Sequence, residues 1–191
     1  MDDLIEELHA DHIKFSMVLD LLAEQLERIH EGKSADYHLM LDAVSYIENY
    51  AEFTLVPKED AIFKKSSEDD SFVDLRGTIK LLRSDNYELK SLARKLHNYI
   101  NAVLEDSIFE KEKFERRLEA CIQHQLDHMH MEEIIVFPLL RKRLSAEQIK
   151  NLSVDYKTKS STLISNNISY KYSKLYGQMT ESRNSSSRSI H

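Results

Sequence analysis

Apolar residues recur every three or four positions along most of the chain, which is the spacing of one buried face of an α-helix. This pattern predicts a first helix over residues 2–29, and Gly32 suits its end because glycine adopts the left-handed conformation without steric cost. A second helix is expected from Asp36. We expect a kink or break in it at Pro57, because proline lacks an N–H and clashes with the preceding turn. The polar run over residues 66–71 predicts a loop.

The same spacing predicts two more long helices, over residues 72–104 and 107–143, and a short one over residues 145–152. The expected inward face of the last long helix is Phe114, Leu118, Cys121, Ile135 and Leu139. Four long amphipathic helices with short links predict an all-α, up-down-up-down four-helix bundle. We expect this bundle to occupy residues 1–152 and a C-terminal tail to occupy residues 153–191.

The tail differs from the body in charge. Residues 155–191 contain six Lys or Arg and two Asp or Glu, whereas the whole chain has a net charge of -7. Apolar residues keep helical spacing over residues 161–179, so we expect an amphipathic helix there that docks on the acidic body, or on a second chain in a homodimer or with another protein partner. The Ser-rich stretch after it is expected to be disordered.

Composition narrows the class of protein. The chain has 191 residues with only 3 Gly and 2 Pro, and 31% of its residues are charged, which favours long helices over a strand-rich fold. It lacks the run of about 18 apolar residues that a membrane span needs, and its negative charge argues against general nucleic-acid binding. The single cysteine, Cys121, and an acidic N-terminus unlike a signal peptide favour a cytoplasmic protein.

Each of the four apolar stripes is interrupted by polar residues. The inward positions are His12, with His9 one turn earlier, then Glu59, Asn86, His124, His128 and Glu132. Buried carboxylates without partners cost several kcal/mol each, so facing histidines or a metal ion must satisfy them. Imidazole and carboxylate groups together suit iron, manganese or zinc. For His124 taken alone, we favour a hydrogen-bonded core histidine.

Several segments resemble the hemerythrin-like, or HHE cation-binding, domains. They are LHADH at residues 8–12, YIENY at 46–50, PKEDAIF at 57–63, and HMHMEE at 128–133 running into VFP at 136–138. The resemblance covers roughly residues 2–152. It implies a four-helix bundle that holds a non-heme iron centre, usually of two irons, and a role in oxygen binding or sensing, in iron or nitric-oxide responses, or in repair of iron centres.

The resemblance also implies a set of metal ligands. Carried over position by position, they are His9 or His12, Glu59, His128 and Glu132, with a weaker match of His30 to an extra ligand of the iron-centre repair branch. Two departures reduce the set. Leu55 and Val56 stand where the family usually has one or two histidines, and Asn86 stands where the third helix usually offers one. We therefore expect one iron ion or none rather than a full di-iron centre.

These observations predict a non-enzymatic, hemerythrin-like metal-binding protein with an incomplete site. Its expected role is in stress, redox or gas response or in signalling, rather than in oxygen carriage. The alternative is a metal-free bundle that serves as an interaction or structural protein, and a second alternative is a di-iron repair or redox protein. The metal content of the purified protein discriminates between the three.

Overall fold

A computed structural model describes residues 3–105 and 110–159 of the chain, together with Tyr172, Leu175 and Gly177. Its α-helices are α1 (Leu4–His30), α2 (Tyr37–Tyr50), α3 (Val56–Glu68), α4 (Arg76–Leu104), α5 (Lys111–Met131), α6 (Phe137–Arg143) and α7 (Ala146–Lys159). Two π-helical segments, η1 (Ala51–Leu55) and η3 (Glu132–Val136), and a 3₁₀ segment, η2 (Asp70–Leu75), join some of them. The all-α prediction is confirmed over the described residues, but the count of four long helices is not, because η1 and η3 interrupt two of the predicted helices.

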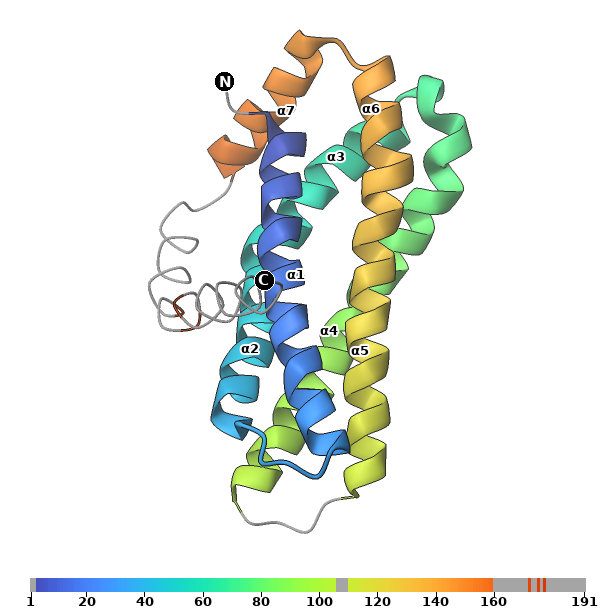
Figure 1. Cartoon of the computed structure of the whole chain (residues 1–191). Helices are drawn as coiled ribbons and strands as arrows, with labels where there is room; N and C mark the ends of the chain where they lie inside the picture. The colour runs from blue at the N-terminus through green and yellow to red at the C-terminus, as the bar shows by residue number, and fades with distance from the viewer. Residues whose placement is uncertain (1–2, 106–109, 160–171, 173–174, 176, 178–191) are drawn as a thin grey trace, which may run out of the picture.

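The long helices lie side by side along the long axis of the molecule (Figure 1). α2, η1 and α3 follow one another directly, as do α5, η3 and α6, so each set forms one interrupted rod. α7 packs against α1 and α3 at one end. There the backbone N–H of Leu4 donates a hydrogen bond of 2.9 Å to the Ser153 hydroxyl, which joins the start of α1 to α7.

The ends of α1 and the start of α2 follow from local chemistry. The Asp3 side chain accepts a hydrogen bond from the N–H of Ile5, and Asp36 does the same for Leu39, so both aspartates cap a helix. Gly32 adopts a φ of 72°, as the sequence predicted, and its N–H donates to the carbonyl of Ile29. This is the usual glycine-terminated end of a helix.

The apolar stripes of the helices meet in one core. Its largest fully buried side chains are Tyr46, Phe15, Phe63, Phe72 and Phe114. Aromatic rings of this size bury more apolar area than any other side chains, so they account for much of the packing between the rods.

Both prolines follow a π-helical turn. Pro57 is the second residue of α3, after η1, and Pro138 is the second residue of α6, after η3. A π turn bonds each residue to one five positions away, which is a common way to accommodate an irregularity inside a helix. The break expected at Pro57 takes the form of η1, whereas the sequence reasoning did not predict η3.

η3 changes which side chains face the core. The apolar spacing predicts Ile135 inward, but Ile135 is 37% exposed, and Val136 and Leu140 are buried instead. The prediction for Ile135 is wrong because Ile135 lies within η3. A π turn contains more residues than an α turn, so the side chains in it and after it are rotated around the helix.

The predicted loop over residues 66–71 is also largely helical. α3 continues to Glu68, and η2 covers Asp70–Leu75, so α4 begins at Arg76 rather than at Phe72. The Asp69 side chain accepts a hydrogen bond from the N–H of Ser71, which lets a polar segment form a short helical turn.

The tail lies mostly outside the described residues, and so do the predicted helix over 161–179 and the predicted disorder after it. Of the described tail residues, Tyr172 is 3% exposed and Leu175 is 2% exposed. The Tyr172 hydroxyl accepts a hydrogen bond of 3.0 Å from the Asn49 side chain, and its ring meets that of Tyr46 edge-on. These contacts lie on α2. The division of the chain at residue 152 and the docking of the tail stay predictions.

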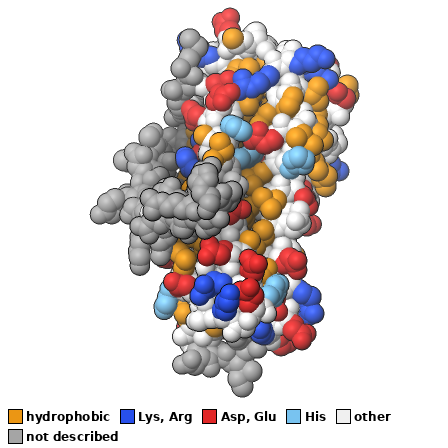
Figure 2. Space-filling view, viewed as in Figure 1, with side chains coloured by type: hydrophobic (Ala, Val, Ile, Leu, Met, Phe, Trp, Pro, Cys, Tyr) orange, Lys and Arg blue, Asp and Glu red, His pale blue; other side chains and the backbone are white. Residues whose placement is uncertain are grey.

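The surface carries charges of both signs. Figure 2 shows acidic and basic side chains interspersed at both ends of one face, with hydrophobic side chains between them. Within the described residues, we find no helix with the length and apolar character needed to cross a membrane.

Candidate metal centre

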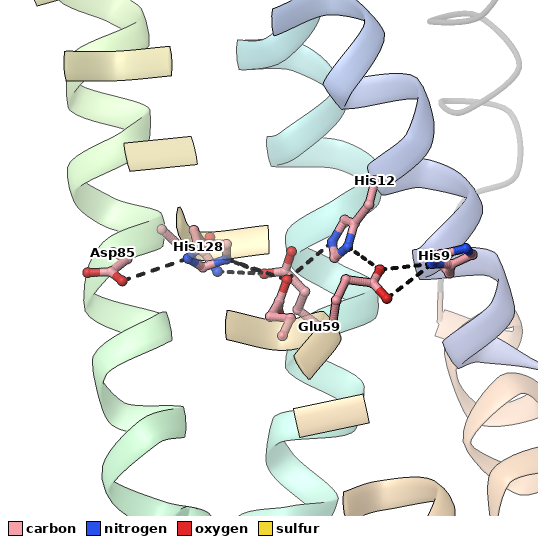
Figure 3. Close-up of polar contacts among 8 residues, drawn as sticks. His9, His12, Glu59, Asp85 and His128 are labelled. Atoms are coloured by element: carbon pink, nitrogen blue, oxygen red, sulfur yellow. Dashed lines mark hydrogen bonds and ion pairs between the residues drawn. The ribbon is translucent and has the colours of Figure 1, made fainter. Parts of the chain in front are cut away.

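A cluster of buried charged side chains lies between the helices (Figure 3). His12 comes from α1, Glu59 from α3, His128 from α5 and Glu132 from η3, and none of the four is more than 5% exposed. Three separate rods therefore supply two imidazoles and two carboxylates to one part of the core.

The functional atoms of this cluster are close together. The Nε2 atom of His12 lies 3.2 Å from Oε2 of Glu132. The Nε2 atom of His128 lies 3.7 Å from that same oxygen and 3.9 Å from Oε2 of Glu59. One ligand-type atom from each of His12, Glu59 and Glu132 lies within 4.8 Å of the other two, which is close enough for the three to share one ion.

Most of these atoms are buried without a hydrogen bond to any described residue. They are Nε2 of His12, Oε1 of Glu59, both ring nitrogens of His128 and both carboxylate oxygens of Glu132. Buried polar atoms are nearly always hydrogen-bonded, and leaving one unpaired costs about 1–3 kcal/mol. So many unpaired donors and acceptors facing one another fit a cation, and nitrogen with carboxylate oxygen is a set that iron, manganese or zinc accepts.

The electrostatics of the cluster show what the metal-free protein does instead. Burial disfavours the charged form of His128, but the carboxylates of Glu59 and Glu132 outweigh this and raise its pKa to about 9. Burial similarly opposes protonation of His12, but contacts with Glu132 and Glu133 raise its pKa above the ordinary value. Burial raises the pKa of Glu132, and the nearby Glu59 carboxylate adds to this shift. Protons therefore balance the buried charge when no metal ion does.

His12 is held by a carboxylate outside the cluster. Its Nδ1 atom lies 2.8 Å from Oε1 of Glu133, and Nδ1 of His9 lies 3.1 Å from both oxygens of that carboxylate. A carboxylate partner on one ring nitrogen fixes the tautomer that leaves the other nitrogen free for a metal. The structure places His12, and not His9, in the cluster, because the His9 side chain is 53% exposed and its ion pair within the described residues is with Glu133.

The two weaker histidine candidates lie elsewhere. Nε2 of His124 lies 3.6 Å from Asp85, whose other oxygen is 3.9 Å from Nδ1 of His128, so His124 belongs to the surroundings of the cluster. His30 pairs with Glu115 at 4.0 Å. It is 18 positions beyond His12 on the same helix, which is about 27 Å of helical rise. The structure therefore does not bring His30 to the cluster.

Asn86 and Leu55 complete the cluster on its remaining side. The Asn86 side chain donates a hydrogen bond of 2.7 Å to Oε2 of Glu59. Leu55 is 2% exposed and contributes only an apolar surface. On this side of the cluster, Asn86 therefore acts as a hydrogen-bond donor and Leu55 is aliphatic.

Sequence reasoning missed the buried ion pair beside the cluster. Nζ of Lys58 lies 2.7 Å from Oδ2 of Asp11, and the Tyr50 hydroxyl donates to the other oxygen of Asp11 at 2.7 Å. Asp11 and Lys58 directly precede His12 and Glu59, so this pair fixes α1 against α3 at the level of the cluster. The available signal was the position of Asp11, three residues after the buried Leu8.

Comparison with known proteins agrees with this site. The family model described as the hemerythrin HHE cation-binding domain matches residues 3–147, which is more than half of the chain. The chain therefore belongs to the hemerythrin HHE cation-binding domain family. Searches of the curated proteins and of the solved structures found no match.

Proposed function

We propose that this protein binds one non-heme metal ion, iron, through His12, Glu59, His128 and Glu132. The observation that carries the proposal is the set of buried, facing polar atoms on these four side chains that lack hydrogen bonds within the described residues. The cation-binding character of the family supports it.

One ion, rather than two, follows from the side chains on the Asn86 side of the cluster. An aliphatic side chain such as that of Leu55 cannot coordinate a metal ion, and Asn86 already donates its amide hydrogen to Glu59. In our proposal, α1, α2 with α3, α4, and α5 with α6 form the up-down-up-down four-helix unit that carries the ion, and α7 is an addition to it.

The proposed role is in stress or redox response or in signalling in the cytoplasm, without catalysis and without oxygen carriage. A bound iron ion would supply a redox-active centre. The chain's own residues would do the rest: Glu133 orients His12, the Asp11–Lys58 pair holds α1 against α3, and the surrounding apolar core limits the access of water.

An anaerobic titration of metal-free protein with Fe(II) tests this proposal. We expect saturation at one ion per chain and a rise in Tm, because a ligand that binds only the native state stabilises it. Glu59→Gln should weaken binding by more than about tenfold, since even partners outside the ligand shell contribute 10–100-fold. Glu119→Gln, at an exposed position of α5, is the matched control and should bind as the parent does. No iron-dependent change in Tm would favour the metal-free interaction bundle, whereas equal binding by parent and Glu59→Gln would show that iron binds through other residues.

A further inference from the structure

A cavity of about 410 Å³ lies between the α2–η1–α3 rod and α4. Its walls include the apolar side chains of Ile47, Leu55 and Leu89, and Asn86 and Gln125 also line it. This volume is typical of pockets that bind small organic molecules. Asn86 connects the cavity to the metal-type cluster through its hydrogen bond to Glu59, but the cavity does not depend on a metal ion.

Gln125 is a mostly buried polar residue in the wall of this cavity. It is only 4% exposed, and its amide atoms are not among the enclosed polar atoms that lack a hydrogen bond, so they are reached from the cavity. A buried carboxamide usually has partners for both its donor and its acceptor atoms. The amide atoms of Gln125 therefore depend on what occupies the cavity. Asn86 is similar, because its amide nitrogen is bound to Glu59 and no described residue donates to its oxygen.

The charges around the cavity show what kind of molecule fits. Lys90 pairs with Glu52 at 2.8 Å, Arg83 pairs with Asp60 at 3.3 Å, and Glu48 lies 3.6 Å from Arg94. Each charged side chain that lines the cavity thus has an oppositely charged neighbour. An ionic ligand would have to break one of these pairs, and an anion would also approach the Glu59 carboxylate. A neutral ligand meets neither penalty.

We infer that this cavity is a binding site for a neutral, mainly apolar small molecule with one hydroxyl or similar group that both donates and accepts hydrogen bonds. The apolar body packs against Ile47, Leu55 and Leu89. The polar group reaches the carboxamides of Asn86 and Gln125. This site goes beyond the proposed iron site and would be present in metal-free protein.

The test uses the full chain, stripped of metal by a chelator, and 2-naphthol as the probe, with 2-naphthoate as its charged counterpart. Isothermal titration should show one 2-naphthol bound per chain with a dissociation constant at or below about 1 mM. 2-Naphthoate should bind at least about tenfold more weakly. Using metal-free protein keeps this result separate from the success or failure of the iron proposal.

Two variants and a matched control locate the site. Gln125→Leu should weaken 2-naphthol binding about tenfold, because it removes a hydrogen-bonding partner, yet it should change the Tm of the free protein little, since no hydrogen bond joins the Gln125 side chain to another described residue. Gln123→Leu makes the same change at an exposed position of α5 outside the cavity and should bind as the parent does. Ala51→Leu adds bulk to the cavity wall and should abolish binding. The inference is overturned if the parent shows no saturable binding, or if both Gln125→Leu and Ala51→Leu bind as well as the parent.

Discussion

The two sides of the buried cluster carry different chemistry. On the side formed by α1 and the α5–η3 rod, His12, His128 and Glu132 lie within ion-pair distance of one another or of Glu59. On the side formed by η1 and α4, Leu55 and Asn86 stand beside a cavity of about 410 Å³. Glu59 lies between the two sides and contacts both.

The difference arises from side chains rather than from the backbone. Both the α2–α3 rod and the α5–α6 rod contain a five-residue π segment followed by a proline. Glu132 begins one of these segments and Leu55 ends the other. The backbone of the bundle is therefore similar on both sides. The side chains differ: one side has imidazole and carboxylate groups that can bind a metal ion, and the other has a cavity lined in part by carboxamide groups. A single substitution at Leu55 or Asn86 therefore tests how the side chains on the η1–α4 side affect the cluster while the backbone stays the same.

The largest expected effect is the pH dependence of the ligand side. In metal-free protein the pKa of His128 is raised from 6.5 to about 9, so its stabilising contribution is complete below pH 6.5 and is lost as the pH rises through 9. The raised pKa of Glu132 has the same sign, since its protonated form is favoured in the folded protein, but that contribution is lost at lower pH, as the pH rises through about 7. We expect the free energy of unfolding to fall by up to about 3 kcal/mol between pH 6.5 and pH 9.

Urea denaturation at several pH values measures this fall. His128→Gln should flatten the profile over that interval, whereas His97→Gln, which changes a partly exposed histidine on α4, should leave it as it is in the parent. A parent profile that is level from pH 6.5 to pH 9 would show that the cluster does not hold protons in the way described.

Histidine at positions 55 and 86 should give the η1–α4 side of the cluster the same kind of metal ligands as the opposite side. Leu55→His with Asn86→His supplies two further imidazoles next to Glu59, so we expect the double variant to bind a second iron ion. Without metal, Leu55→His should destabilise the fold by roughly 2–3 kcal/mol, from lost apolar burial and a new unpaired polar group. Iron should reverse this loss. Elemental analysis and Tm with and without iron measure both effects, and a double variant that gains neither iron nor iron-dependent stability would show that these positions do not face the metal.

Among the residues that the structure describes, Asn86 donates the hydrogen bond that Glu59 receives from this side. Asn86→Leu should destabilise the metal-free protein by about 1–2 kcal/mol, because Glu59 loses a charge-assisted hydrogen bond while remaining buried. Urea denaturation measures the change. Asn101→Leu, at a partly exposed position of α4, controls for the effect of leucine in that helix. Equal stabilities of parent and Asn86→Leu would mean that Glu59 does not need this donor.

The smallest expected effect distinguishes His9 from His12. His9→Gln should change iron affinity by less than about threefold, because the His9 side chain is 53% exposed and pairs with Glu133 rather than with a residue of the cluster. His12→Gln should remove most of the binding. Parallel Fe(II) titrations of the two variants give the comparison, and a loss with His9→Gln as large as that with His12→Gln would place the ligand role on both histidines.

Much of this arrangement could be predicted from helical spacing. The positions of His12, Asn86, His128 and Glu132 follow from extending the apolar stripes, because none of them lies beyond a π turn in its helix. Glu59 follows η1, but its position could still be predicted from its spacing to the buried Leu55 and Ile62. Ile135 could not be placed in this way, since it lies within the π turn of η3, where the helical register changes. The effect of Pro57 was foreseen, whereas the π turn before Pro138 was not.

The surroundings of the cluster were harder to predict because they depend on contacts between helices. Glu133 has the sequence context of a solvated face, yet it holds His12 from outside the cluster. Asp11 and Lys58 pair across two helices that are far apart in sequence. The cavity beside Asn86 depends on how closely α4 approaches η1, and periodicity within a single helix contains no information on that distance.

Metal stoichiometry tests the central claim most directly. The protein should be purified from cells supplied with iron, and its iron, manganese and zinc content per chain should be measured by elemental analysis. We expect one iron ion per chain in the parent and almost none in Glu132→Gln. Two ions per chain in the parent would contradict the one-sided site, and a parent without metal would contradict the proposal that the buried histidines and carboxylates bind iron.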